Sequence, residues 1–277
     1  MPAIPVPTIH LFSRLEEKLI QLLQSLSPDE WNQPTIARLW TVKDIAAHLL
    51  DGNLRMLSIM RDNYIGDPPD QINSYDDLLR YLNKLNADFV AAMKRVSPAT
   101  LLQLMETTGK QYCQQLNSLD PFAPAVFAVS WAGDTESPNW FHIAREYTER
   151  WHHQQQIRDA LGKPGILDRQ FYYPVLATFM YGLPHAYRHA DAPGGTLVKI
   201  TITGDAGGTW WLLRKDHSWV LTEDSNLPAA AHCSIDGSVA WKLFTKSWRK
   251  KDVQDHFSIE GNPLLAEPVL EMITVMA

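Results

Sequence analysis

The chain has 277 residues, of which 45% are hydrophobic and 20% are charged, and this is the composition of a soluble globular protein. Its formal net charge of -6 argues against a general affinity for nucleic acid or for acidic membrane surfaces. The length exceeds what one ordinary hydrophobic core needs, so we expect two domains.

The amino-terminal residues do not read as a targeting signal. Residues 1–7 are apolar and rich in proline, but they lack the basic start and the apolar core of a signal peptide. No apolar run is long enough to span a bilayer. These features predict a cytoplasmic protein that does not interact with membranes, and they leave its oligomeric state open.

The two cysteines, Cys113 and Cys233, lie far apart in the sequence and form no Cys-x-x-Cys pair. A thiol-based zinc knuckle or redox motif is therefore excluded. We expect two free thiols that act as small buried hydrophobes, and a catalytic cysteine beside a histidine is the alternative.

Hydrophobic spacing predicts several amphipathic helices in the first two thirds of the chain. Thr41 and Asp44 form a variant of the capping box, and Ser74 or Asn73 can cap the next helix. Ser97-Pro98 closes that helix, and residues 99–136 read as a less regular stretch. A helix from about residue 137 should end at Gly162. The expected helices cover residues 9–26, 41–64, 74–93, 137–162 and 171–188.

The four longest of these helices have mostly short connections, which is typical of a four-helix bundle. From residue 196 the pattern changes to alternation, which predicts strands over 197–203, 209–213 and 219–221 and shorter ones over 231–235 and 257–259. Two further helices are expected over 238–245 and 263–275. The sequence therefore predicts an α+β protein with a helical bundle at residues 1–190 and a smaller α/β domain at residues 191–277.

The expected helix 137–162 carries Glu149 and His153 four positions apart, so both side chains lie on one helix face. His48 lies at the edge of the inward face of the expected helix 41–64. Two imidazoles and one carboxylate form an open metal site suited to Lewis-acid chemistry. The alternative is a solvated ion pair, worth about 0.3 to 0.5 kcal/mol, with a hydrogen-bonded histidine at the edge of the core.

The segments Trp-Thr-Val-Lys-Asp-Ile-Ala-Ala-His-Leu around His48 and Glu-Arg-Trp-His-His-Gln-Gln-Gln-Ile-Arg from Glu149 resemble the DinB-like superfamily, and within it the mycothiol-dependent maleylpyruvate isomerase branch. The resemblance implies a divalent metal, commonly zinc, held by His48, Glu149 and His153. His152 is the competitor for the last position. An acidic residue usually follows the last ligand by three positions, whereas this chain has Gln156, which can orient an imidazole but cannot raise its basicity as a carboxylate does.

The resemblance also implies that the carboxy-terminal domain is sterol-carrier-like. It implies a metal-bound thiolate, from mycothiol or bacillithiol as co-substrate, that attacks a small electrophile, so that the protein is a thiol-dependent S-transferase or isomerase. One alternative is a hydrolase with a metal-bound hydroxide and Glu146 as base. Another is a non-catalytic metal-binding or ligand-binding protein, with the tryptophans of the second domain around an apolar ligand.

Several further residues are candidates for the surroundings of the metal. Gln156, His142 and Glu146 are candidates for the second shell, and His142 and Glu146 share the stripe of Glu149 and His153. Asp44, Asn53 and Arg55 are candidates by proximity to His48 in sequence, although surface positions are the ordinary expectation for these residue types. The basic residues Lys242, Lys246, Arg249, Lys250 and Lys251 read as a solvated face or as a site for an acidic group.

Overall fold

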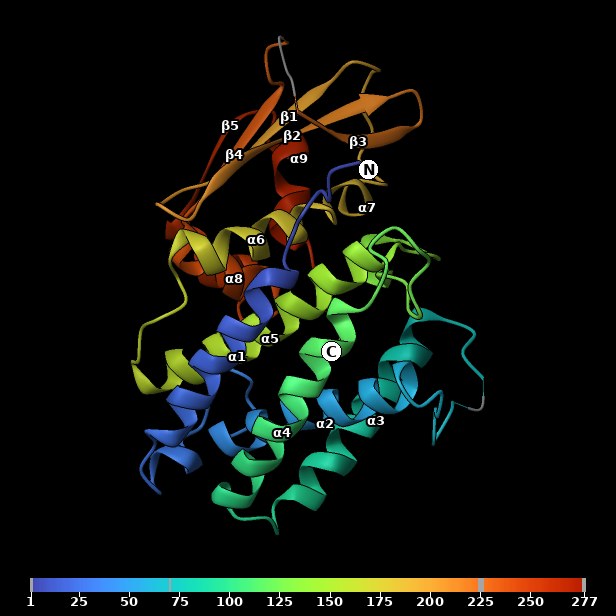
Figure 1. The fold of residues 1–277 in the computed structure, drawn as a ribbon. Helices are drawn as coiled ribbons and strands as arrows, with labels where there is room; N and C mark the ends of the chain where they lie inside the picture. Colours follow the sequence, from blue (N-terminus) through green and yellow to red (C-terminus); the bar gives the residue numbers. More distant parts are fainter. Residues whose placement is uncertain (1, 70, 224–226, 276–277) are drawn as a thin grey trace. The chain divides into compact units, whose positions relative to one another are not determined.

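The computed structural model describes residues 2–69, 71–223 and 227–275 of the chain (Figure 1). The helices are α1 (Ile9–Gln24), α2 (Val42–Met60), α3 (Tyr75–Met93), α4 (Pro98–Asn117), α5 (Asn139–Leu161), α6 (Arg169–Met180), α7 (Leu183–Ala186), α8 (Gly237–Phe244) and α9 (Pro263–Ala266). The short 3-10 helices are η1 (Glu30–Asn32), η2 (Ser130–Ala132), η3 (Lys250–His256) and η4 (Glu267–Glu271). The strands are β1 (Leu197–Ile202), β2 (Gly208–Lys215), β3 (Ser218–Thr222), β4 (Ala231–Ile235) and β5 (Phe257–Gly261). Among the described residues, no helix combines the length and the apolar character that crossing a membrane requires.

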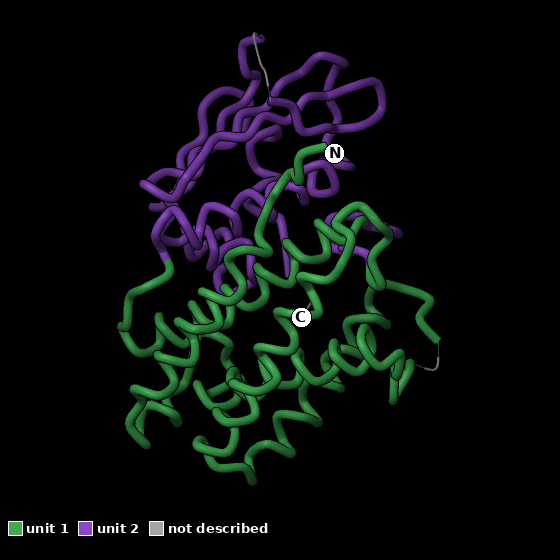
Figure 2. The backbone as a smooth tube through the Cα atoms, in the orientation of Figure 1, with its two compact units in different colours: residues 1–127, 138–166, 276–277 green, residues 128–137, 167–275 purple. Residues whose placement is uncertain are grey.

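The described residues form two compact units that alternate along the chain (Figure 2). The first unit contains residues 2–127 and 138–166, and the second contains residues 128–137 and 167–275. The predicted α+β organisation, a helical region followed by a sheet, is confirmed. The units divide after residue 166 because α6 and α7 group with the sheet, whereas the boundary at residue 190 follows the change in hydrophobic pattern and stays a prediction.

In the first unit, α1, α2, α4 and α5 form the bundle, and α3 packs against α2. The apolar stripe predicted for α1 is buried, with Leu15, Leu19 and Leu23 each at most 2% exposed. In contrast, α3 buries only Asn86 and Val90. The bundle core is therefore made by the other four helices, and α3 is an addition to it.

Helix α4 corrects the expectation of an irregular stretch after residue 98. The Ser97 side chain accepts a hydrogen bond from the N–H of Thr100, and Pro98 occupies the first turn, so Ser-Pro here begins a helix. Leu101, Met105 and Leu116 are fully buried along its inner face. The bundle therefore draws one of its four helices from a segment whose many polar residues obscured the periodicity.

The ends of α2 and α5 follow the predicted signals. At the start of α2, the Thr41 Oγ1 atom accepts from the Asp44 N–H, and an Asp44 carboxylate oxygen accepts from the Thr41 N–H, which completes the capping box. Helix α5 ends at Gly162 with φ 63°, a left-handed conformation that favours glycine. The two helices that carry the predicted metal ligands are thus capped as expected, α2 at its start and α5 at its end.

The second unit contains a five-stranded sheet, within the described residues, in the order β3-β2-β1-β4-β5. The β1 and β4 strands run parallel, and the other neighbours are antiparallel. One face is apolar and buried, with Val198, Ile200 and Cys233 each 0% exposed. Helices α6, α8 and α9 lie on one side of this sheet (Figure 1). All five predicted strands are thus present, and the sheet is covered on one face, as in other α+β domains.

Candidate metal centre

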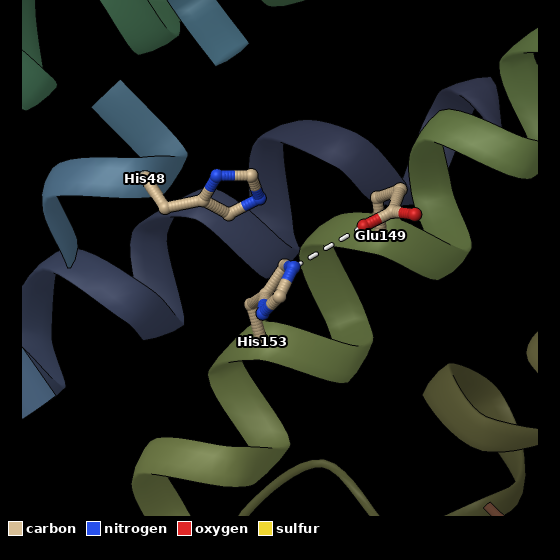
Figure 3. Close-up of side chains that lie close together, drawn as sticks. All are labelled: His48, Glu149 and His153. Carbon is tan, nitrogen blue, oxygen red and sulfur yellow. Dashed lines mark ion pairs between the residues drawn. The ribbon is translucent and has the colours of Figure 1, made fainter. Parts of the chain in front are cut away.

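His48 on α2 and Glu149 and His153 on α5 point toward one another inside the first unit (Figure 3). One ligand atom from each residue lies within 4.8 Å of the others. The His48 and His153 ring centroids are 4.6 Å apart, and the Glu149 Oε2 atom lies 3.2 Å from the His153 Nε2 atom. In the described part of the chain, this is the one group of three or more histidine, cysteine or acidic residues with such spacing.

Gln156 is the hydrogen-bond partner of the His153 ring at Nδ1. The Gln156 Oε1 atom lies 2.9 Å from the His153 Nδ1 atom, and because an amide oxygen accepts, this contact favours the tautomer with the proton on Nδ1. In that tautomer the Nε2 lone pair faces the Glu149 Oε2 atom at 3.2 Å, so a cation would be bound between two acceptors. This arrangement fits a divalent metal ion.

His48 is suited to ligation because it is held neutral. Burial lowers the pKa of His48 well below its ordinary value, and the positive charge of Arg55 adds to this effect. Its Nδ1 atom is buried without a hydrogen-bond partner. The Trp40 ring centroid lies 4.8 Å from that of His48 and 6.1 Å from that of His153, so Trp40 forms an apolar wall for the centre. No sequence pattern indicates this role for Trp40.

His152 is 4% exposed and lies beside the centre rather than in it. Its ring centroid is 4.8 Å from that of His153, but it is outside the group of three residues with converging ligand atoms. The geometry therefore supports His153 over His152 as the third ligand.

His142 and Glu146 form a second polar cluster on α5. The Arg145 Nη2 atom lies 2.8 Å from the His142 Nδ1 atom, and Arg145 forms an ion pair of 2.6 Å with Glu146. The Tyr112 hydroxyl donates to the Glu146 Oε2 atom at 2.5 Å. Burial raises the pKa of Glu146, but the positive charge of Arg145 and the hydrogen bond from Tyr112 outweigh burial and lower it. Glu146 is thus an ionised carboxylate whose oxygens are already engaged.

Two of the candidates near His48 are buried, so the surface positions expected for Asp44 and Asn53 are wrong. Asp44 is 7% exposed and caps α2, and Asn53 is 0% exposed. Arg55 is partly exposed and pairs with Asp51 at 2.9 Å. His142 is 0% exposed. His142 and His153, from the polar stripe of α5, therefore lie inside the protein. This contradicts the alternative of a solvated helix face.

The two cysteines and two residues of the basic run have ordinary structural roles. Both cysteines are free thiols, as predicted, and burial raises the pKa of Cys113 and raises that of Cys233 to about 12. A thiol with a raised pKa is a poor nucleophile at neutral pH. In the basic run, Lys250 pairs with Glu267 at 3.0 Å and the Lys242 Nζ atom lies 4.7 Å from the Trp248 ring centroid.

Buried His142 gives a pH-dependent stability. Burial lowers its pKa from 6.5 to about 4, and the positive charge of Arg145 adds to this. Between pH 6.5 and pH 4, His142 is protonated in the unfolded chain but stays neutral in the folded protein. The free energy of unfolding therefore falls as the pH falls. We expect His142 to contribute a loss of about 3 kcal/mol between pH 6.5 and pH 4, at about 1.4 kcal/mol per unit.

Urea unfolding of the metal-free protein and of a His142→Gln variant across this pH range measures the contribution. The variant keeps an acceptor for Arg145 but cannot take up the proton, so its stability should depend less steeply on pH. Equal slopes for the two proteins would contradict the expectation.

Comparison with known proteins relates the chain to one family. Two solved structures match over 94% of this chain and 96% of theirs, at 10% sequence identity. They are the mycothiol-dependent maleylpyruvate isomerase, with a TM-score of 0.53, and a variant of it with one histidine replaced by alanine, with a TM-score of 0.57. No curated protein matches the chain.

At this identity, the similarity to solved structures shows the shared fold. The sequence comparison goes further, because residues 12–158 match the family described as the mycothiol maleylpyruvate isomerase N-terminal domain. This matched region contains His48, Glu149 and His153 and spans more than half of the chain. The chain therefore belongs to the mycothiol maleylpyruvate isomerase N-terminal domain family.

Proposed function

We propose that the protein is a metal-dependent S-transferase or isomerase of the maleylpyruvate isomerase type that uses a low-molecular-weight thiol. His48, Glu149 and His153 would hold a divalent ion, for which zinc fits the two imidazoles and one carboxylate best. The observation that carries the proposal is the convergence of these three side chains within 4.8 Å in a bundle of this family.

A divalent ion bound by three protein ligands keeps open positions and lowers the pKa of a bound thiol or water toward neutral pH. Four residues would favour binding of the ion at this site. Burial keeps His48 neutral, Glu149 supplies one negative charge, and Gln156 orients His153 through its Nδ1–H group. The Trp40 ring limits access of water to the two imidazoles on one side.

Mycothiol or bacillithiol is the proposed co-substrate, and a small electrophile is the proposed substrate. The family and the names of the two similar structures support a mycothiol-dependent reaction. An isomerase adds the thiol and then eliminates it after bond rotation, whereas a transferase releases the conjugate. The two outcomes differ in whether the thiol is consumed.

The test is to follow thiol loss and product formation with mycothiol, bacillithiol or glutathione and a generic electrophile, and then with maleylpyruvate. The zinc-loaded protein should conjugate or isomerise with at least one thiol, and chelation of the metal should remove the activity. If no thiol supports turnover and an ester or amide is cleaved instead, the proposal fails.

The structure offers little support for the hydrolase alternative. Its proposed base, Glu146, accepts a hydrogen bond from Tyr112 and pairs with Arg145. A general base needs a free lone pair within reach of the water that it deprotonates. The same assay distinguishes the two reactions, because hydrolysis requires no thiol.

Gln156 gives a test of the orientation of His153. A Gln156→Leu variant removes the acceptor for the Nδ1–H group, so we expect the metal affinity to fall by about 10- to 100-fold, as for other second-shell losses. A Gln156→Glu variant keeps an acceptor and adds a charge, so it should bind metal at least as tightly as the wild-type protein. Competition with a chromophoric chelator measures both. Equal affinities for the leucine variant and the wild-type protein would remove Gln156 from the site.

A further inference from the structure

Arg150, next to Glu149 in sequence, is held inside the first unit by the three other helices of the bundle. Its Nη1 atom donates to the Glu16 Oε2 atom on α1 at 2.8 Å, and its Nη2 atom donates to the Asn53 Oδ1 atom on α2. The guanidinium carbon lies 4.5 Å from the centroid of the Tyr112 ring on α4. Glu16, Asn53 and Arg150, which we call the clasp, are at most 8% exposed.

Two neighbouring residues of α4 contact the clasp, Thr108 by a hydrogen bond and Gly109 by leaving space. The Thr108 Oγ1 atom accepts a hydrogen bond from the Asn53 Nδ2 atom at 3.0 Å. A Cβ atom on the neighbouring Gly109 would lie 2.3 Å from the Glu16 Oε1 atom, so a larger residue there would make this carboxylate move. Because glycine in a helix interior is unfavourable relative to alanine, its position opposite Glu16 indicates that the carboxylate has a role there.

Stability alone is a poor explanation for the clasp. A buried ion pair loses hydration, and apolar residues of similar volume are often as stabilising. The Glu16 Oε1 and Arg150 Nε atoms are also buried without hydrogen-bond partners, which adds to the cost. A role in fixing one arrangement of helices explains such a group better.

The clasp includes both helices that carry the candidate metal ligands and joins them to α1. Helix α2 carries both His48 and Asn53, and on α5 Arg150 lies between Glu149 and His153. Successive residues on a helix point about 100° apart, so the direction of Arg150 sets the direction of Glu149. The ends of the side chains lie about 5 to 6 Å from the helix axis. A rotation of α5 by about 20° about this axis would therefore move them by about 2 Å. Metal–ligand distances tolerate only about 0.2 Å.

We propose that Arg150 is a positioning residue: through Glu16 and Asn53 it fixes the rotation of α5, so that Glu149 and His153 face His48 in the geometry that binds metal. This inference rests on the proposed metal centre. It adds a requirement that the three ligands alone do not meet, namely a fixed rotation of the helix that carries two of them.

The experiment separates positioning from folding. In the triple variant Glu16→Leu, Asn53→Leu, Arg150→Met, apolar side chains replace the clasp. The urea midpoint is measured on metal-free protein, and Co²⁺ binding is measured by competition and by visible absorption. The control Lys84→Gln, Asp88→Asn removes an exposed ion pair of α3. We expect the triple variant to keep the wild-type urea midpoint or exceed it, but to bind Co²⁺ about 10- to 100-fold more weakly, with an altered spectrum.

The wild-type affinity and spectrum in the triple variant would overturn the inference, whatever the urea midpoint. If the triple variant does not fold, Arg150→Lys decides, because it keeps the charge but not the fork that reaches both partners. Unchanged Co²⁺ binding by that variant would also overturn the inference. Co²⁺ binding that survives His48→Ala in a protein with the clasp intact would instead contradict the metal centre itself, so the two failures are distinguishable.

The two glycines of the bundle helices provide an independent check. Gly109→Ala forces the Glu16 carboxylate to move, whereas a Cβ atom on Gly52 in α2 would meet nothing within 4 Å. We expect Gly109→Ala to weaken Co²⁺ binding and Gly52→Ala to leave it unchanged. Equal binding by both variants would show that the placement of Glu16 does not affect the metal centre.

Discussion

Replacement of His48 or His153 by alanine is expected to reduce zinc in the purified protein from about one ion per chain to a trace. Each variant removes one of three proposed ligands and leaves two, so the affinity should fall by more than the 10- to 100-fold that second-shell losses cause. Thiol-dependent activity should disappear with the metal. Elemental analysis of the purified variants, followed by titration with Zn²⁺ against a chelator, measures the effect.

Two other histidines serve as controls for these variants. His10 is exposed on α1, and His10→Ala should keep the wild-type metal content. His152→Ala should also retain its metal, because the three proposed ligands do not include His152. A protein that loses its metal with His152→Ala and keeps it with His153→Ala would reverse the assignment.

Replacement of Arg150 by alanine should destabilise the protein by about 3 to 5 kcal/mol, because it leaves the Glu16 carboxylate buried without its partner. The side chains of Arg150 and Glu16 are 6% and 9% exposed, so water screens the remaining charge little. Urea unfolding of metal-free protein at neutral pH measures the loss. This single variant differs from the apolar triple variant, which removes all the charges and hydrogen-bonding groups together.

The exposed pair Lys84 and Asp88 again supplies the comparison. Lys84→Ala should leave the urea midpoint nearly unchanged, because exposed ion pairs contribute little to stability. If Arg150→Ala changes stability no more than Lys84→Ala does, the buried ion pair between Arg150 and Glu16 does not stabilise the protein.

The features that the sequence predicted best are those determined by neighbouring residues. The capping box of Thr41 and Asp44, the glycine end of α5 and the alternating strands depend on local hydrogen bonds and side-chain direction. The spacing of Glu149 and His153 likewise requires only a helix. Helix α4 was missed because Ser97-Pro98 has the residues both of a helix end and of a helix start, and only the packing of Leu101 and Met105 decides between them.

The features that the sequence could not predict depend on residues distant in the chain. Arg150 on a helix is ordinarily a solvated cation, and its burial depends on Glu16, which lies 134 residues earlier. The same is true of the contact between Trp40 and His153. A polar residue inside a bundle is recognised only when its partner is known, so the interior of α5 could not be read from its own sequence.

The alternation of the two units along the chain limits how the protein can be divided. Residues 128–137 leave the bundle between α4 and α5 and belong to the second unit, where Val129 and Trp131 are at most 5% exposed. A fragment that ends at residue 166 would retain these two apolar side chains without their packing partners in the second unit. The helical part is therefore not a module that one cut can release or that a simple fusion can transplant, although it holds all three proposed ligands.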